Sequence, residues 1–122
     1  MFFTVGRIAL FNKRSGKPKP DASWLQIPID RPSGSPLQNP IVVHDEADRD
    51  LACDGFEKHL RKAIRQKDKK IITALNRIVD AAMRGENVAL MCWCTPKRCH
   101  GLPIKRICEK KIARLLRETG IR

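Results

Sequence analysis

The chain has 122 residues, of which 42% are hydrophobic and 31% charged, a globular rather than a disordered composition. Lysine and arginine number 25 against 13 acids, and the resulting formal net charge of +12 favours polyanionic partners. No apolar run reaches the roughly 18 residues of a membrane span, so no membrane contact is expected. Five cysteines are too few, and odd in number, for a secreted disulfide scaffold. We therefore expect one small basic domain over residues 1–122, located in the cytoplasm of a bacterium or its host.

The first part of the chain alternates short apolar stretches with proline-containing loops. Residues 2–11 are apolar and rich in β-forming residues, which predicts a buried strand. Residues 12–22 form a basic, flexible loop. Residues 23–29 predict a second short strand, and Pro28 places it at a sheet edge because proline cannot donate to a β-ladder. Three prolines within residues 30–40 exclude a helix there.

Helical patterns dominate the middle of the chain. Apolar residues recur at helical spacing over 56–64, with basic residues on the other faces. A second pattern covers residues 71–83 and ends before Gly85, a favourable C-terminal cap. The pattern leaves open whether residues 66–70 separate two helices or join them.

The last third predicts a strand, a loop and a helix. Residues 88–94 read VALMCWC, the continuous apolar run of a strand buried in a parallel sheet. Pro103 is suited to the first turn of the helix that follows. Together the elements predict an α/β domain with a mostly parallel sheet, helices after residue 54 and a C-terminal helix. The inner stripe of that helix is expected to be Ile104, Cys108, Ile112 and Leu115.

The loop between this strand and this helix carries the candidate chemistry. Ligands of open α/β sheets lie beyond the carboxyl ends of the strands. Cys99, His100 and Gly101 come just before the helix, where unpaired backbone N–H groups attract anions. Lys97 and Arg98 add positive charge beside them. The arrangement predicts a phosphate site.

The same position favours a reactive thiol. A cysteine near a helix N-terminus and beside cations has a lowered pKa, so Cys99 is the leading thiolate candidate. His100 would transfer a proton or orient a ligand. In the alternative interpretation Cys99 packs inward as a small apolar residue and His100 caps the helix.

A metal site is not expected from this cluster. Cys92 and Cys94 lie on one face of a strand, which separates their sulfurs by roughly 6 to 7 Å. Tetrahedral zinc needs sulfurs about 3.8 Å apart. Zinc held by these two cysteines with Cys99 and His100 therefore stays the alternative, and no cofactor is predicted.

The remaining aromatic and cysteine residues have simpler interpretations. Cys53, Cys108 and Trp93 are expected in the core. Trp24 is either a core residue or a platform for stacking a base.

Two stretches concentrate positive charge. Residues 58–70 hold seven basic residues against one acid, and residues 97–117 hold eight against one. On helices they would form either a stripe that neutralises phosphates or a solvated face. The candidate nucleic-acid contacts are Lys58, Arg61, Lys62, Arg65, Lys105, Arg106, Lys110 and Arg114.

Residues 92–101 read C-W-C-T-P-K-R-C-H-G. This run resembles the hallmark C-W-C-x-P-x-x-C-H-G of the uncharacterised DUF4326 family of bacteria and bacteriophages, and two further stretches resemble motifs of the same family. Residues 31–40 resemble its R-P-S stretch, and residues 48–56 resemble the D-R-D-x-A-x-x-x-F entry to its first helix. The chain departs from the pattern at Gln38, where glycine is usual, and at residues 102–103, where an acid often follows.

The resemblance implies a Rossmann-like, three-layer α/β fold with a nucleotide-related pocket. It does not supply a reaction, and the lost acid after the hallmark weakens the case for catalysis. Carried over position by position, the pocket residues are Arg31, Ser33, Asn39, Asp48, Arg49, Cys94, Pro96, Cys99, His100 and Gly101.

Three functions follow from these observations. The first is a phage or bacterial accessory protein that binds a phosphate-bearing ligand, either a nucleotide or a nucleic acid. The second is an enzyme that uses Cys99 or Cys94 as nucleophile, with help from His100, on a nucleotide or nucleobase. The third is a phage protein that binds an acidic host protein and whose cysteine motif is purely structural.

Overall fold

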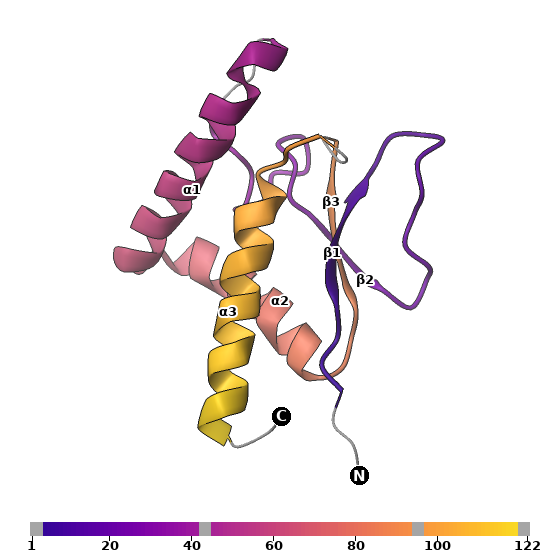
Figure 1. Ribbon diagram of the computed structural model, residues 1–122, viewed down its shortest axis with the longest axis vertical. Coiled ribbons are helices and arrows are strands. Elements are labelled where there is room, and N and C mark those ends of the chain that lie inside the picture. Colours follow the sequence, from indigo (N-terminus) through magenta and orange to yellow (C-terminus); the bar gives the residue numbers. More distant parts are fainter. Residues whose placement is uncertain (1–3, 42–44, 94–96, 120–122) are drawn as a thin grey trace.

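A three-stranded parallel sheet organises the protein (Figure 1). The computed structural model describes residues 4–41, 45–93 and 97–119. Strand β3 (Val88–Cys92) lies between β1 (Ile8–Asn12) and β2 (Leu25–Pro28). The predicted parallel sheet is confirmed, and so is the edge position of the strand that ends at Pro28.

Three helices follow the first two strands. A short 3-10 turn, η1 (Glu46–Asp48), leads into α1 (Arg49–Arg65), and α2 (Lys69–Met83) comes before β3. The C-terminal helix α3 (Gly101–Thr119) completes the chain order, as the sequence predicts. None of the helices in the described part of the chain has the length and apolar composition to cross a membrane.

The break between α1 and α2 has a local cause. Lys67 adopts a left-handed conformation with φ of 57°, which ends the first helix. Asp68 then caps the second helix, because its side chain accepts a hydrogen bond from the backbone N–H of Ile71. The open question of residues 66–70 is thus answered by two helices. Gly85, with φ of 89°, follows the end of α2 as predicted.

The core lies between one face of the sheet and all three helices. Alternate strand residues, such as Ile8, Val88 and Leu90, share that face. Phe56 and Leu60 of α1 are fully covered beside them. Burial of side chains of this size contributes about 1.5–3 kcal/mol each. The core therefore fixes the helices against the sheet.

The second face of the sheet is covered by a loop. The helices lie on one side of the sheet in Figure 1, and residues 13–24 lie on the other. The chain crosses the sheet in one direction from β1 to β2 and in the opposite direction from β2 to β3. Because crossovers between parallel strands are right-handed, these two connections pass over opposite faces of the sheet. Trp24 of this loop is half-buried, with its ring centroid 5.4 Å from that of Phe11. The predicted α/β class, with a parallel sheet and a C-terminal helix, is confirmed.

Candidate functional site

A cavity of about 300 Å³ lies beyond the carboxyl ends of β2 and β3. This is the edge at which open parallel sheets bind ligands. Three segments build it: the turn after β2, the start of α1, and the residues between β3 and α3. The cavity is lined by Asp30, Arg31, Pro32, Asn39, Ile41, Arg49, Cys53, Cys92, Trp93 and His100.

Asp30 anchors one wall of the cavity. Its carboxyl group is only 5% exposed, and both oxygens lie 2.9 Å from Lys13 Nζ. Trp93 donates from Nε1 to the same carboxylate at 2.8 Å. Burial raises the pKa of Asp30, but the hydrogen bonds from Lys13 and Trp93 outweigh it, so the pKa lies below its usual value. Asp30 therefore stays ionised and holds the Trp93 ring at the cavity.

His100 closes the inner end of the cavity. Its Nε2 lies 2.8 Å from the carbonyl oxygen of Ile29, so Nε2 carries the hydrogen and donates it. The imidazole also meets the ring of Phe56 edge-on, with centroids 5.0 Å apart. Burial lowers the pKa of His100, although the bond to Ile29 opposes the change. A neutral imidazole with Nδ1 as the acceptor results.

Cys92 and Cys99 are buried in contact with each other next to His100. Cys99 is 1% exposed and does not line the cavity. Its Sγ lies 3.2 Å from Cys92 Sγ and 3.8 Å from His100 Nδ1, and the described cysteines form no disulfide. The residues that line the cavity include Cys53 and Cys92, which are 6% and 1% exposed. Cys99 is the leading nucleophile from sequence, but it is not among the lining residues. Cys94, the other candidate, lies outside the described residues.

Gly101 serves packing rather than ligand approach. A Cβ at this position would lie 2.5 Å from Leu10 Cδ2 and 2.9 Å from Ile29 Cδ1, so both side chains would have to shift to admit alanine at the start of α3. The Gly101 N–H donates to Cys99 Sγ, and the N–H of Leu102 donates to the carbonyl of Cys99. The first N–H groups of α3 are thus occupied within the chain. This finding argues against the anion site that we expected at the start of this helix.

Arg31 and Asn39 come from the proline-rich turn after β2. Arg31 is exposed, and its Nη2 donates to the carbonyl of Asn39 at 2.8 Å. The Asn39 amide donates to the carbonyl of Ala52 at 3.1 Å and accepts from the N–H of Ile41 at 2.9 Å. Asn39 therefore fastens the turn to α1, and Arg31, whose guanidinium has further N–H donors beyond this bond, lines the cavity.

Arg49 links the cavity to α1. Its Nε and Nη2 both donate to the Glu46 carboxylate, at 2.8 Å and 3.1 Å, and its Nη1 donates to the carbonyl of Arg98 at 3.3 Å. The side chain is 19% exposed. Arg49 thus lies at the cavity with a fixed orientation.

Lys97 and Arg98 fasten the loop to α1 instead of facing the cavity. Lys97 pairs with Glu46 at 3.4 Å, and Arg98 pairs with Asp50 and Asp54. These hydrogen bonds, the one to Asp54 foremost, raise the pKa of Arg98. The acidic stretch at the start of α1 therefore binds the basic loop. The expectation that both cations serve a phosphate is not supported by their position.

Two further predicted residues are not brought to the cavity. Ser33 donates from Oγ to the carbonyl of Asp30 and lines a separate hollow beside α2. Asp48 precedes α1 and makes no side-chain capping bond there. Pro96 lies outside the described residues. Among the residues that the structure describes, no three histidine, cysteine or acidic side chains are grouped to hold a metal ion.

The predicted basic stripe divides into two sets. On α1, Lys58, Arg61, Lys62 and Arg65 are exposed. Glu57 pairs with Arg61 at 3.7 Å and with Arg106 of α3 at 3.9 Å, so a long side chain of α3 reaches α1 there. On α3, Lys105 pairs with Glu109 and Arg114 with Glu118, whereas Lys110 is exposed.

Sequence reasoning missed Asp30 and misplaced Trp93. Trp93 was expected in the core but is 47% exposed, because it follows the last residue of β3 and turns to Asp30. Asp30 directly follows the apolar stretch of the second strand, and this position could have identified it as a residue of the site. Cys53 is buried as expected, yet it also lines the cavity.

Comparison with known proteins gives one match. Residues 12–110 match a family model that is described only as a domain of unknown function. Neither the curated proteins nor the solved structures contain a match.

Proposed function

Since the chain belongs to the DUF4326 family, for which no activity is described, we propose a function from its cavity: binding of a small phosphate-bearing ligand of the nucleotide class. The observation that carries the proposal is Arg31, which lines a cavity of about 300 Å³ beyond the carboxyl edge of the sheet and pairs with no acidic side chain among the described residues; Arg49 lies at the same cavity, paired with Glu46. Guanidinium groups bind phosphate through paired N–H donors. The volume is at the lower end of ligand pockets, which favours a mononucleotide over a larger cofactor.

The walls of the cavity suit the rest of a nucleotide. The half-exposed indole of Trp93 offers an aromatic face, and its bond to Asp30 restricts its orientation. The carboxylate of Asp30 is paired with Lys13, which reduces its repulsion of an anion. A base stacked on Trp93 with its phosphate toward Arg31 uses both features.

Calorimetric titration with AMP, adenosine and inorganic phosphate tests this proposal. We expect Arg31→Gln to weaken AMP binding by about tenfold or more, since a hydrogen bond to a charged group contributes about 1.5–3 kcal/mol. Arg84→Gln is the matched control, because Arg84 follows α2 and precedes β3 at the opposite edge of the sheet. Equal affinity for AMP and adenosine, equal losses in both variants, or no binding of any of the three would reject the proposal.

A second candidate function, binding of a nucleic acid, is supported by α1. Lys58, Lys62 and Arg65 are exposed at helical spacing, and no acidic side chain among the described residues pairs with them. Fluorescence anisotropy with a labelled 20-nucleotide DNA or RNA at two salt concentrations tests it. Replacing all three by glutamine should reduce the salt dependence, since each phosphate contact contributes about 0.7–0.9 to the slope. Absence of salt-sensitive binding by the wild type would exclude this function.

A cysteine-dependent reaction has weaker support. Cys99 is buried away from the cavity, and Cys92 Sγ lies against it at 3.2 Å. Cys92 is among the residues that line the cavity, although it is itself only 1% exposed. Mass-spectrometric comparison of alkylation at Cys92 with and without AMP tests whether ligand and thiol share the site.

A further inference from the structure

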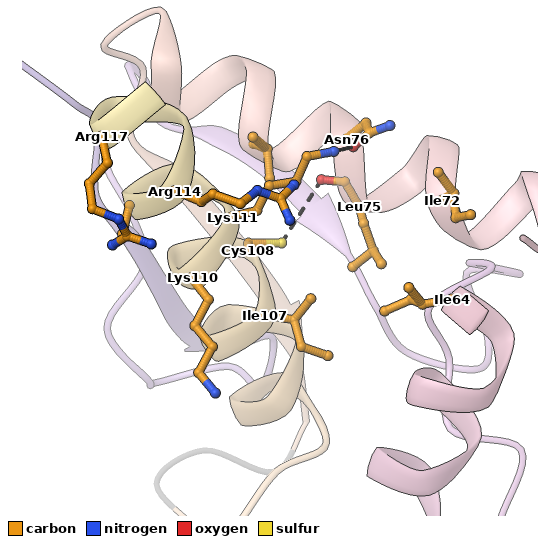
Figure 2. A pocket seen from close by; sticks show the side chains of 12 residues that line it. Ile64, Ile72, Leu75, Asn76, Ile107, Cys108, Lys110, Lys111, Arg114 and Arg117 are labelled. Atoms are coloured by element: carbon orange, nitrogen blue, oxygen red, sulfur yellow. Dashed lines mark hydrogen bonds between the residues drawn. The ribbon is translucent and has the colours of Figure 1, made fainter. Parts of the chain in front are cut away.

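A groove of about 610 Å³ separates α2 from α3, with the end of α1 closing one side (Figure 2). It lies apart from the cavity described above and shares no lining residue with it. Its surface is mainly apolar. The apolar side chains that line it are Ile64, Ile72, Leu75, Val79, Ile107 and Ala113.

One side of the groove is strongly basic. Lys110, Lys111, Arg114 and Arg117 of α3, here called the basic rim, all line it, and no acidic residue does. Figure 2 shows these side chains on one helix, with Ile72 and Ile64 across the opening. Lys111 donates to the side-chain oxygen of Asn76, and Arg114 pairs loosely with Glu118 at 3.7 Å. Within the described chain, Lys110 and Arg117 have no acidic partner.

The basic rim has a spacing that a second helix can match. Lys110, Arg114 and Arg117 follow one another by four and three residues, and so form a row about 10 Å long at 1.5 Å per residue. A second helix with carboxylates four and three residues apart has a row of the same length, so each carboxylate can lie opposite one of these cations. The groove differs from a surface that binds phosphates, because phosphate binding needs cations and no apolar side chains. Here isoleucine side chains line the groove beside the cations.

We propose that the groove between α2 and α3 binds an acidic amphipathic helix of a partner protein. Its apolar face covers Ile64, Ile72 and Ile107, and its carboxylates meet the basic rim. This is the helix-in-groove mode of recognition, with apolar anchors at helical spacing and charge pairing along one edge. The proposal is independent of the ligand in the cavity.

A displayed library of 16-residue helical peptides provides the test. The apolar face is fixed in the library, and the flanking positions vary among glutamate, lysine and glutamine. We expect selection on the full chain to enrich glutamate at the flank that meets α3. Failure to enrich any peptide, or enrichment without glutamate, would overturn the proposal.

Two charge variants then locate the binding of one enriched peptide. Lys110→Glu with Arg114→Glu should weaken binding by about tenfold or more, as expected for reversed charges at an interface. Lys17→Glu with Lys69→Glu is the control, because it lowers the net charge of +12 by the same four units at exposed positions outside the groove. Equal losses in the two variants, or displacement of the peptide by a short DNA duplex at equal charge concentration, would show nonspecific attraction and overturn the proposal.

Discussion

Replacement of Asp30 by asparagine tests whether one buried carboxylate holds the cavity wall. The carboxylate is 5% exposed and accepts from Lys13 at both oxygens and from Trp93 at 2.8 Å. Hydrogen bonds to charged groups contribute about 1.5–3 kcal/mol each, but Lys13 is 27% exposed and asparagine keeps one acceptor. We therefore expect Asp30→Asn to lower the free energy of unfolding by about 2 kcal/mol at pH 7.

Urea unfolding measures this loss, and a double-mutant cycle assigns it. The cycle combines Asp30→Asn with Lys13→Met and follows circular dichroism and tryptophan fluorescence together. We expect a coupling free energy of about 1 kcal/mol or more, because the two groups are in contact and share one charge pair. A coupling below about 0.3 kcal/mol would refute the argument, since that is the usual value for independent sites.

The pH dependence gives a second check on Asp30. Its pKa in the folded state lies below the ordinary aspartate value of about 3.9. The unfolded chain therefore takes up the proton first as the pH falls, and the contribution of Asp30 is complete above about pH 4 and decreases below it. The difference in the free energy of unfolding between wild type and Asp30→Asn should shrink as the pH falls from about 4 to about 2. A difference that stays constant over this range would contradict a charge-based role.

Three further predictions concern the start of α3 and its buried face. Gly101→Ala should lower the free energy of unfolding by about 1–2 kcal/mol in urea, because the new Cβ would lie within 3 Å of Leu10 and Ile29; an unchanged midpoint would contradict this packing. His100→Phe should cost about 1–3 kcal/mol, since the carbonyl of Ile29 loses its donor. Burial lowers the pKa of His100, so wild-type stability should also decline as the pH falls below about 6.5, and the variant should lack this decline. Burial raises the pKa of Cys108 to about 12, so mass spectrometry at pH 8 should find its alkylation about a thousandfold slower than that of a free cysteine; comparable rates would show that α3 opens.

The sequence patterns predicted the elements better than their ends. The apolar run that forms β3 and the stripe on α3 are confirmed, because burial on both faces or along one stripe leaves a clear periodicity. The first strand is confined to Ile8–Asn12, although apolar character starts earlier. Helix α1 begins at Arg49, before its apolar pattern becomes regular. These ends depend on capping and on tertiary hydrogen bonds, which hydrophobic patterns do not record.

The sequence predicted where the cavity lies but only some of the residues that line it. Arg31, Asn39, Arg49 and His100 do line it, because residues after parallel strands converge at one edge. Cys99 does not line the cavity, because its side chain is buried against Cys92. Sequence neighbours therefore point in different directions at the turn into α3, and spacing alone does not separate the residue that faces the ligand from the one that packs.

The distribution of acids explains why net charge alone is a poor guide to the binding surfaces of this protein. Glu46, Asp50 and Asp54 neutralise Lys97 and Arg98, the cations that the sequence places beside the helix N-terminus. Cations without acidic partners lie elsewhere in the described chain, on the exposed face of α1 and along the groove beside α3. An ion pair at the surface contributes little to stability, but it removes a cation from the field that a polyanion meets. The surplus of +12 therefore acts through α1 and α3, and in the cavity, where Glu46 pairs with Arg49, it acts through Arg31.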